Sequence, residues 1–160
     1  MAPYELKNFV SSETNVVVLI VANEPQCNEV CFGGEEGNNL ESLLAPGSCV
    51  FLCSTVAAQW VKGAYERLAK KEIQFADCPM SGGPVRAANG ELTIMASGEE
   101  ATLAYVDPIL QAMGKEVHII QGGPGMGNTA KMAHQLLADA HIALSGEAMA
   151  LAAKAGLDVQ

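Results

Sequence analysis

The chain has 160 residues, of which 49% are hydrophobic and 17% charged, and its formal net charge is −9 at pH 7. This length is enough for one domain of ordinary size, and the composition is that of a globular protein rather than a disordered one. The negative charge argues against a nucleic-acid binder, whose surface would be basic, but one or two local cations would suffice for a small anionic substrate. No uninterrupted apolar run approaches the roughly 18 residues of a membrane span, and Glu5 and Glu13 interrupt the pattern of a signal peptide.

The five cysteines are an odd number in a chain large enough to fold without disulfides. Free thiols in a reducing compartment are the simpler interpretation, so we expect a cytoplasmic protein without a membrane partner. Cys27 and Cys31 could share a helical face, but no second pair follows at zinc spacing. Cys49 and Cys53 would be about 13 Å apart along a strand, too far for one metal ion. We therefore expect no metal site.

Short apolar runs bounded by turn residues predict strands at residues 15–22, 48–53, 73–76 and 117–120. Helical patterns lie between them at residues 24–32, 57–71 and 99–113. This alternation predicts an α/β fold with a doubly wound parallel sheet. Residues 92–97 follow an Asn-Gly pair and predict an added hairpin strand.

The last part of the chain predicts a single long helix. Residues 128–155 contain no proline and one glycine, Gly146, and a helix of this length would extend about 42 Å. Asn128 or Thr129 can cap its start, and Gly156 suits its end. Apolar residues lie on nearly every side of it, so we expect it to be buried along much of its length. A helix of this kind after a Rossmann-like sheet suggests a connection into a second, helical domain.

A first glycine-rich motif, DCPMSGGPVRAANG at residues 77–90, leaves the third predicted strand at its C-terminal end. Open α/β sheets bind their ligands at that end of their strands. Ser81, Gly82 and Gly83 present a hydroxyl and closely approachable backbone N–H groups, which suit a carboxylate. The alternative is a tight turn without a ligand, because glycine pairs are common turn residues.

A second glycine-rich motif, GGPGMGNTAKMAHQ at residues 122–135, opens the long helix. Gly125, Gly127 and Ala130 formally match the dinucleotide fingerprint G-x-G-x-x-G/A. The fingerprint also requires a second strand and an acidic residue about 20 residues further on, where this chain continues as helix. We therefore reject a pyrophosphate site at these glycines.

Lys131, His134 and Gln135 share one face of the long helix. A lysine on a mostly apolar helix is expected to be partly buried, and burial lowers the pKa of a lysine so that it can accept a proton. The alternative is a lysine that snorkels to solvent near the helix start. Asn23 and Thr55 follow two predicted strands and could contact a cofactor at that edge, although such residues are more often simple helix caps.

Together the two motifs resemble those of the β-hydroxyacid dehydrogenase family, which includes 3-hydroxyisobutyrate and tartronate semialdehyde-type dehydrogenases. Residues 77–90 resemble the substrate-binding D-x-P-x-S-G-G-x-x-x-A-x-x-G, and residues 122–135 resemble the catalytic G-x-x-G-x-G-x-x-x-K-x-x-x-N. The order and separation of the motifs agree, and the resemblance spans nearly all of the chain.

The resemblance implies an oxidoreductase that uses NAD or NADP to oxidise the hydroxyl of a small carboxylate substrate. It implies that Lys131 is the catalytic lysine and that Ser81, Gly82 and Gly83 hold the substrate carboxylate. It places Thr55 near the nicotinamide and Asn23 near the adenosine side.

Where the family has asparagine four residues after the lysine, this chain has Gln135, preceded by His134. The run KMAHQLLADAHI resembles the branch of L-threonate dehydrogenases, which act on four-carbon sugar acids. A longer amide and an imidazole could contact extra hydroxyls, so we expect a threonate-like substrate.

The family begins with a strand, a G-x-G-x-x-G turn and an acidic residue at the end of the second strand, and nothing before Asn15 supplies them. Family members also continue for several helices beyond the position of Gln160. We therefore expect an internal fragment, a truncated gene model or a divergent remnant of a longer protein. Its fold would be a Rossmann-type parallel sheet that lacks its first β-α-β unit and is followed by a long interdomain helix. Residues 1–123 would be a partial dinucleotide-binding domain. Residues 124–160 would be the truncated first helix of an all-α substrate and dimerisation domain, homo-oligomeric when full length.

Three alternatives remain open. One is a fragment without catalytic activity that acts only in association, which the missing glycine turn favours. The second is a 3-hydroxyisobutyrate or tartronate semialdehyde-type dehydrogenase. The third is a 6-phosphogluconate-type enzyme of the same superfamily, which would call for more cations than Arg86 and Lys131.

Overall fold

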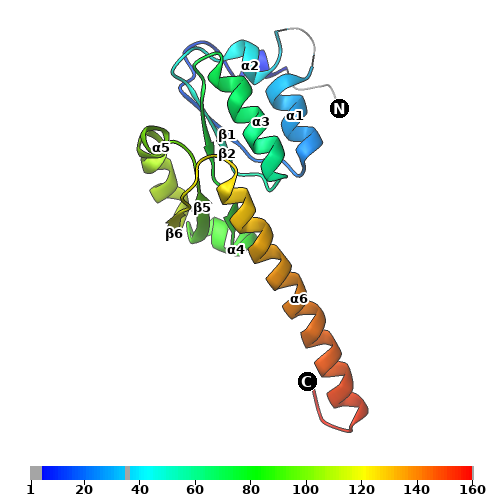
Figure 1. Ribbon diagram of the computed structural model, residues 1–160. Coiled ribbons are helices and arrows are strands. Elements are labelled where there is room, and N and C mark those ends of the chain that lie inside the picture. Colours follow the sequence, from blue (N-terminus) through cyan, green and yellow to red (C-terminus); the bar gives the residue numbers. More distant parts are fainter. Residues whose placement is uncertain (1–4, 35–36, 160) are drawn as a thin grey trace.

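The structure is a computed structural model that describes residues 5–34 and 37–159. It has a layered α/β body from which one long helix projects (Figure 1). In chain order the elements are η1 (Leu6–Asn8), β1 (Val16–Leu19), α1 (Glu24–Phe32), α2 (Leu40–Leu43), β2 (Cys49–Leu52), α3 (Ala58–Ala69), β3 (Gln74–Asp77), β4 (Met80–Ser81), α4 (Gly83–Ala88), β5 (Leu92–Ala96), α5 (Glu100–Met113), β6 (Gly114–Ile119) and α6 (Met126–Lys154).

The first sheet is parallel, in the order β1-β2-β3, and helices cover both of its faces. Because side chains alternate along a strand, Val50 and Leu52 of β2 pack with α1 and α3, whereas Cys49 and Phe51 pack with α5 on the other face. This burial on both faces explains the continuous apolar runs of the sequence. The α/β class predicted from the sequence is confirmed.

A second sheet has the order β4-β5-β6, in which β4 is antiparallel to β5 and β6 is parallel to it. The two sheets meet at a single bridge, where Asp77 and Ser97 exchange two backbone hydrogen bonds of 2.9 and 2.7 Å. The strands of the predicted α/β fold are thus divided between two sheets, and β4 is antiparallel to its neighbour. Pro79 has no N–H group to continue the β3 ladder, and its carbonyl accepts from the N–H group of Met95 in β5 instead.

Helix α6 is in contact with the body only at its start, where Gly127, Asn128 and Lys131 are buried. Beyond them it projects away from the sheets (Figure 1). The prediction that this helix is buried along much of its length is wrong for the described residues, because no other element runs beside it. It exposes the large apolar side chains of Met132, Leu136, Leu137, Ile142, Leu144, Met149 and Leu151.

By length and composition alone α6 could cross a membrane, because the mean hydropathy of an 18-residue window within it is 1.3. This window lies outside the packed body. The helix also carries the ionisable side chains of Asp139 and Glu147, which are costly inside a bilayer. The absence of a membrane partner stays a prediction.

Candidate active site

A pocket of about 370 Å³ lies between the start of α4, the strands β4 and β5, and the first turns of α6. Four of the residues predicted from the two glycine-rich motifs line it together, although the motifs are far apart in the chain. The lining residues are Met80, Ser81, Gly82, Gly83, Pro84, Ala87, Leu92 and Lys131. Lys131 is the one charged residue among them, and the remainder of the wall is mostly apolar.

The floor of the pocket is a backbone turn that requires glycine. Gly82 and Gly83 have φ angles of 138° and 67°, which side chains rarely tolerate. A Cβ atom on Gly82 would also lie 2.9 Å from the Cβ atom of Arg86. The turn into α4 is therefore a tight glycine turn that also lines the pocket beside Lys131, and its binding of a ligand stays a prediction.

Lys131 is 8% exposed, so its side chain does not reach solvent in the way that snorkelling requires. Desolvation by burial lowers the pKa of its ammonium group below the ordinary lysine value of 10.5. No acidic side chain in residues 5–34 and 37–159 forms an ion pair with it. The group is therefore a lysine whose neutral form is favoured relative to an exposed lysine.

The start of α6 is closed by the buried carboxylate of Asp77. Its Oδ2 atom accepts hydrogen bonds from the backbone N–H groups of Gly125 and Asn128 at 3.1 and 3.0 Å. Burial raises the pKa of Asp77, and the hydrogen bonds from Asn128, Ser97 and Gly125 oppose this shift. Since a protein carboxylate already occupies this helix N-terminus, the geometry supports our rejection of a pyrophosphate site there.

His134 and Gln135 lie outside the pocket. Both are exposed, one turn further along α6 than Lys131. The side-chain amide of Gln135 donates a 3.3 Å hydrogen bond to Asp139. Any contact between these two residues and a substrate would involve the part of a substrate that extends out of the pocket.

Asn23 and Thr55 lie at the C-terminal ends of β1 and β2, and both are exposed. Asn23 caps α1, because its Oδ1 atom accepts a 3.0 Å hydrogen bond from the N–H group of Gln26. Thr55 does not cap α3, whose N-cap is Ala57 without a side-chain hydrogen bond. The structure therefore places both at the predicted edge, apart from the residues that line the pocket.

Sequence reasoning gave Asp77 and Ser97 no role and took Asn128 only as a possible cap of the long helix, although all three are buried polar residues beside the candidate site. The N-cap of α6 is Gly125, and the Asn128 side chain bonds Val56 and Asp77 instead. Asp77 and Asn128 stood in the two motifs, and the available signal was an acid at a strand end together with an amide at a helix start. Ser97 follows β5 without such a signal.

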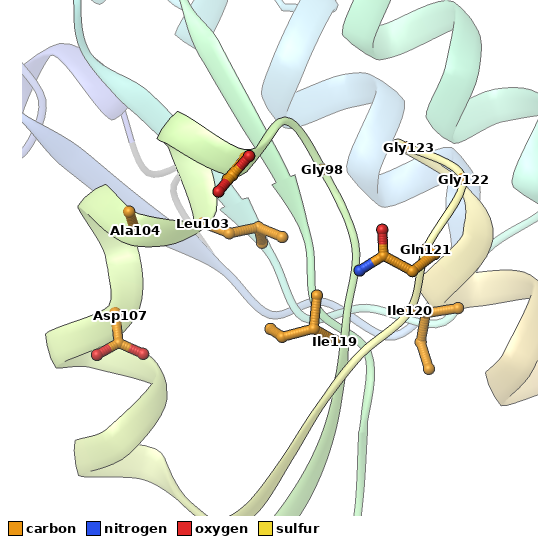
Figure 2. A pocket seen from close by; sticks show the side chains of 10 residues that line it. Gly98, Leu103, Ala104, Asp107, Ile119, Ile120, Gln121, Gly122 and Gly123 are labelled. Carbon is orange, nitrogen blue, oxygen red and sulfur yellow. The ribbon is translucent and has the colours of Figure 1, made fainter.

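A larger groove of about 720 Å³ lies between α5 and the segment that follows β6. Figure 2 shows Leu103, Ala104 and Asp107 on one side of it and Ile119, Ile120 and Gln121 on the other. None of the residues predicted for the active site lines this groove. Among the described residues no group of three or more potential metal ligands is found there or elsewhere.

The sequence model of a family described as the NAD binding domain of 6-phosphogluconate dehydrogenase matches residues 2–122. The chain belongs to this family. L-threonate dehydrogenase from Escherichia coli K12 is 41% identical over 147 residues, which are 92% of this chain and 48% of that protein. The 2-hydroxy-3-oxopropionate reductase of the same strain is 32% identical over 93% of this chain and 50% of its own length.

Among solved structures, 3-hydroxyisobutyrate dehydrogenase from Salmonella typhimurium matches with a TM-score of 0.84 and 38% identity, over 96% of this chain and 52% of that one. This member of the 6-phosphogluconate dehydrogenase NAD-binding family thus spans about half the length of the curated relatives it matches. The resemblance to hydroxyacid dehydrogenases of the L-threonate and 3-hydroxyisobutyrate type is confirmed.

Proposed function

We propose that this chain forms the cofactor-side half of an NAD- or NADP-dependent dehydrogenase that oxidises the hydroxyl of a small hydroxy acid or sugar acid of the threonate type. The single observation that carries the proposal is the convergence of buried Lys131 with Ser81, Gly82 and Gly83 in one pocket. The names of the relatives support the reaction class.

The substrate carboxylate would bind to the Ser81 hydroxyl and to the backbone N–H groups of Gly82 and Gly83. The substrate hydroxyl would then point toward Lys131, which accepts its proton while the adjacent carbon loses a hydride and the C=O bond forms. A lysine with a lowered pKa suits this role, because burial makes its neutral, proton-accepting form easier to reach than that of an exposed lysine. Fixing the substrate at two points would supply much of the rate.

The cofactor would lie along the ends of β1 and β2, and when bound its nicotinamide accepts the hydride. Exposed Thr55 stands there beside the uncapped first turn of α3, and these groups fit the nicotinamide end. The starts of α1 and α6 are closed by Asn23 and Asp77. Among the described residues, the starts of α1 and α6 therefore have no free set of N–H groups for a pyrophosphate.

We also propose the domain organisation inferred from the sequence, with a dinucleotide-binding part at residues 1–123 and the first helix of an all-α domain at residues 124–160. The exposed apolar side chains of α6 support its burial against that domain and against a second copy in a homo-oligomer. The five cysteines are free and buried, which supports a reducing cytoplasmic location.

Three other functions remain as alternatives. A 3-hydroxyisobutyrate or tartronate semialdehyde-type substrate would use the same pocket and leave His134 and Gln135 without contacts. A 6-phosphogluconate-type substrate lacks support, because Lys131 is the one cation that lines the pocket. A purely associative role would leave buried Lys131 unexplained.

The test is a chimera in which this chain replaces the matching segment of E. coli L-threonate dehydrogenase. We expect NAD- or NADP-dependent oxidation of L-threonate, and a fall in kcat of about a thousandfold for Lys131→Met with little change in cofactor affinity. Lys62→Met is the matched control at a lysine outside the pocket. Retention of kcat in Lys131→Met would refute the assigned role.

A further inference from the structure

A continuous set of hydrogen bonds runs along the C-terminal edge of the strands and ends at the helix that carries Lys131. At the end of this set that lies beside β1, the Ser54 hydroxyl accepts a 2.8 Å hydrogen bond from the N–H group of Val21 and donates a 2.9 Å hydrogen bond to the carbonyl of Val21. The carbonyl of Ser54 in turn accepts a 3.3 Å hydrogen bond from the Asn128 side chain. The ends of β1 and β2 are thereby tied to the first turn of α6.

Asn128 is the central member of this set and is fully buried. Its Oδ1 atom accepts a 2.9 Å hydrogen bond from the N–H group of Val56, and its Nδ2 atom donates a 2.6 Å hydrogen bond to Oδ1 of Asp77. Every polar atom of the amide therefore has a partner, and two of the partners flank Thr55. The same side chain thus fixes both the segment that carries Thr55 and the strand that leads into the Ser81–Gly83 turn.

Asp77 closes the set on the other side. Its Oδ2 atom also accepts a 3.0 Å hydrogen bond from the Ser97 hydroxyl, and that hydroxyl accepts from the N–H group of Gly127 at 2.8 Å. All of its partners are donors, so the pattern suits a carboxylate and not an amide at this position.

We propose that Asn128 and Asp77 are a positioning pair that holds Lys131 against the Ser81–Gly83 turn and at a fixed place relative to the Thr55 segment. Lys131 follows Asn128 by three residues, so it lies one helical turn further along the same face of α6. Loss of the hydrogen bonds of Asn128 would change the burial of Lys131 and its distance from both the Ser81–Gly83 turn and the Thr55 segment. The catalytic part of this inference rests on the proposed dehydrogenase function, whereas the holding of Lys131 does not.

The donor and acceptor pattern gives the pair a specific chemical signature. In Asp77→Asn, the NH₂ group of the new asparagine would face the NH₂ group of Asn128. The side-chain amide of Asn128 cannot rotate by 180° to relieve this contact, because its Oδ1 atom accepts the hydrogen bond from the N–H group of Val56. In the double variant Asp77→Asn, Asn128→Asp, the carboxylate at position 128 would accept from both Val56 and the new amide. The double variant would leave Ser54 without its donor, but it would restore the contact between positions 77 and 128.

The experiment follows the titration of the Lys131 side chain in the 160-residue chain by ¹³C NMR of labelled lysine, with Lys131→Arg to assign its signal. We expect the pKa of Lys131 to rise toward the ordinary lysine value in Asn128→Ala and in Asp77→Asn, because its side chain becomes hydrated. We expect the double variant to return most of the way to the unmodified chain.

The matched control is Asn39→Ala. Asn39 is also a buried asparagine that bonds a helix start, accepting from the N–H group of Ser42 at 3.0 Å and donating to the carbonyl of Gly33 at 2.9 Å, but it lies at α2. It should lower Tm without changing the Lys131 titration. If Asn128→Ala does not fold, Ser97→Ala gives the same test with the same expected direction. An unchanged Lys131 titration in a folded Asn128→Ala or Ser97→Ala variant would overturn the proposal.

The same variants in the chimera separate this inference from the proposed function. If Lys131→Met abolishes activity while Asn128→Ala leaves both the titration and kcat unchanged, the positioning role fails and the dehydrogenase proposal stands. If Asn128→Ala shifts the titration while Lys131→Met stays active, the pair holds Lys131 and the catalytic assignment fails.

Discussion

Gly127 in the first turn of α6 lies directly against Met95 of β5. A Cβ atom on Gly127 would overlap the carbonyl oxygen of Met95 and lie 2.8 Å from the carbonyl oxygen of Asp77. These contacts are with backbone atoms that cannot move aside as a flexible side chain would. The glycine that matches a dinucleotide fingerprint is therefore required for close packing of helix against strand, and this packing delivers Lys131 to the pocket.

We expect Gly127→Ala to lower the free energy of unfolding by about 1–3 kcal/mol or more, because the start of α6 must move outward. Gly146→Ala on the same helix is the control, since a Cβ atom there meets nothing within 4 Å and alanine favours a helix. Urea unfolding of both variants makes the comparison. Equal stabilities for the two variants would contradict the packing role of Gly127.

Stability at alkaline pH should depend on the buried thiols. Desolvation raises the pKa of Cys31, Cys49 and Cys53 to about 12 from an ordinary value of 9.0. Because the folded-state pKa is raised, the stabilisation by the neutral thiols is complete below pH 9 and is lost as the pH rises from about 9 toward 12.

Urea unfolding between pH 7 and pH 10.5 measures this loss of stability. Replacement of Cys49 and Cys53 by valine should make the dependence on pH shallower. An equally steep loss in that double variant would assign the effect to other groups.

The exposed apolar side chains of α6 should cause the 160-residue chain to associate. A contiguous apolar surface of this kind usually marks an interface. We expect sedimentation to detect dimers or larger species in the unmodified chain, and a monomer when Leu136, Ile142 and Leu144 are replaced by lysine. The exposed Val85 on α4, replaced by lysine, is the control that should leave association unchanged. A monomeric unmodified chain at high concentration would remove this support for a homo-oligomer.

Substrate preference should depend on His134 and Gln135, which lie beyond the pocket. In the chimera, Gln135→Ala should lower kcat/KM for L-threonate about fivefold to tenfold, the effect of one lost hydrogen bond. Oxidation of 3-hydroxyisobutyrate, which has no further hydroxyl, should be unaffected. Equal losses on the two substrates would show that Gln135 does not contact the extra hydroxyls.

Much of the fold could be predicted from the sequence because hydrophobic periodicity and turn residues determine local structure. Helix α1 begins and ends where it was predicted, and α5 does so within one residue, although it contains Pro108. The short helices α2 and α4 were missed, since four to six residues are too few for a periodic pattern. The division of the sheet was missed because it depends on which strand the carbonyl of Pro79 contacts, a long-range choice.

The pocket residues could be predicted from motifs, because Ser81, Gly82, Gly83 and Lys131 occur at characteristic spacings. The network around Asp77 and Asn128 could not be predicted, because it depends on contacts between residues that are distant in sequence. The exposure of α6 also could not be foreseen, since an apolar helix is normally covered. The sequence pattern indicates that the apolar surface of the helix should be buried, but it does not indicate which element covers it.

The central claim is that Lys131 and the Ser81–Gly83 turn bind the substrate in one pocket. Its most direct test is a titration of the 160-residue chain with L-threonate, monitored through the backbone amide signals in NMR spectra. The claim predicts saturable shifts at Ser81, Gly82 and Gly83, which weaken strongly in Lys131→Met. Absence of shifts at these amides, or shifts confined to Gly122 and Gly123 beside the larger groove, would contradict it.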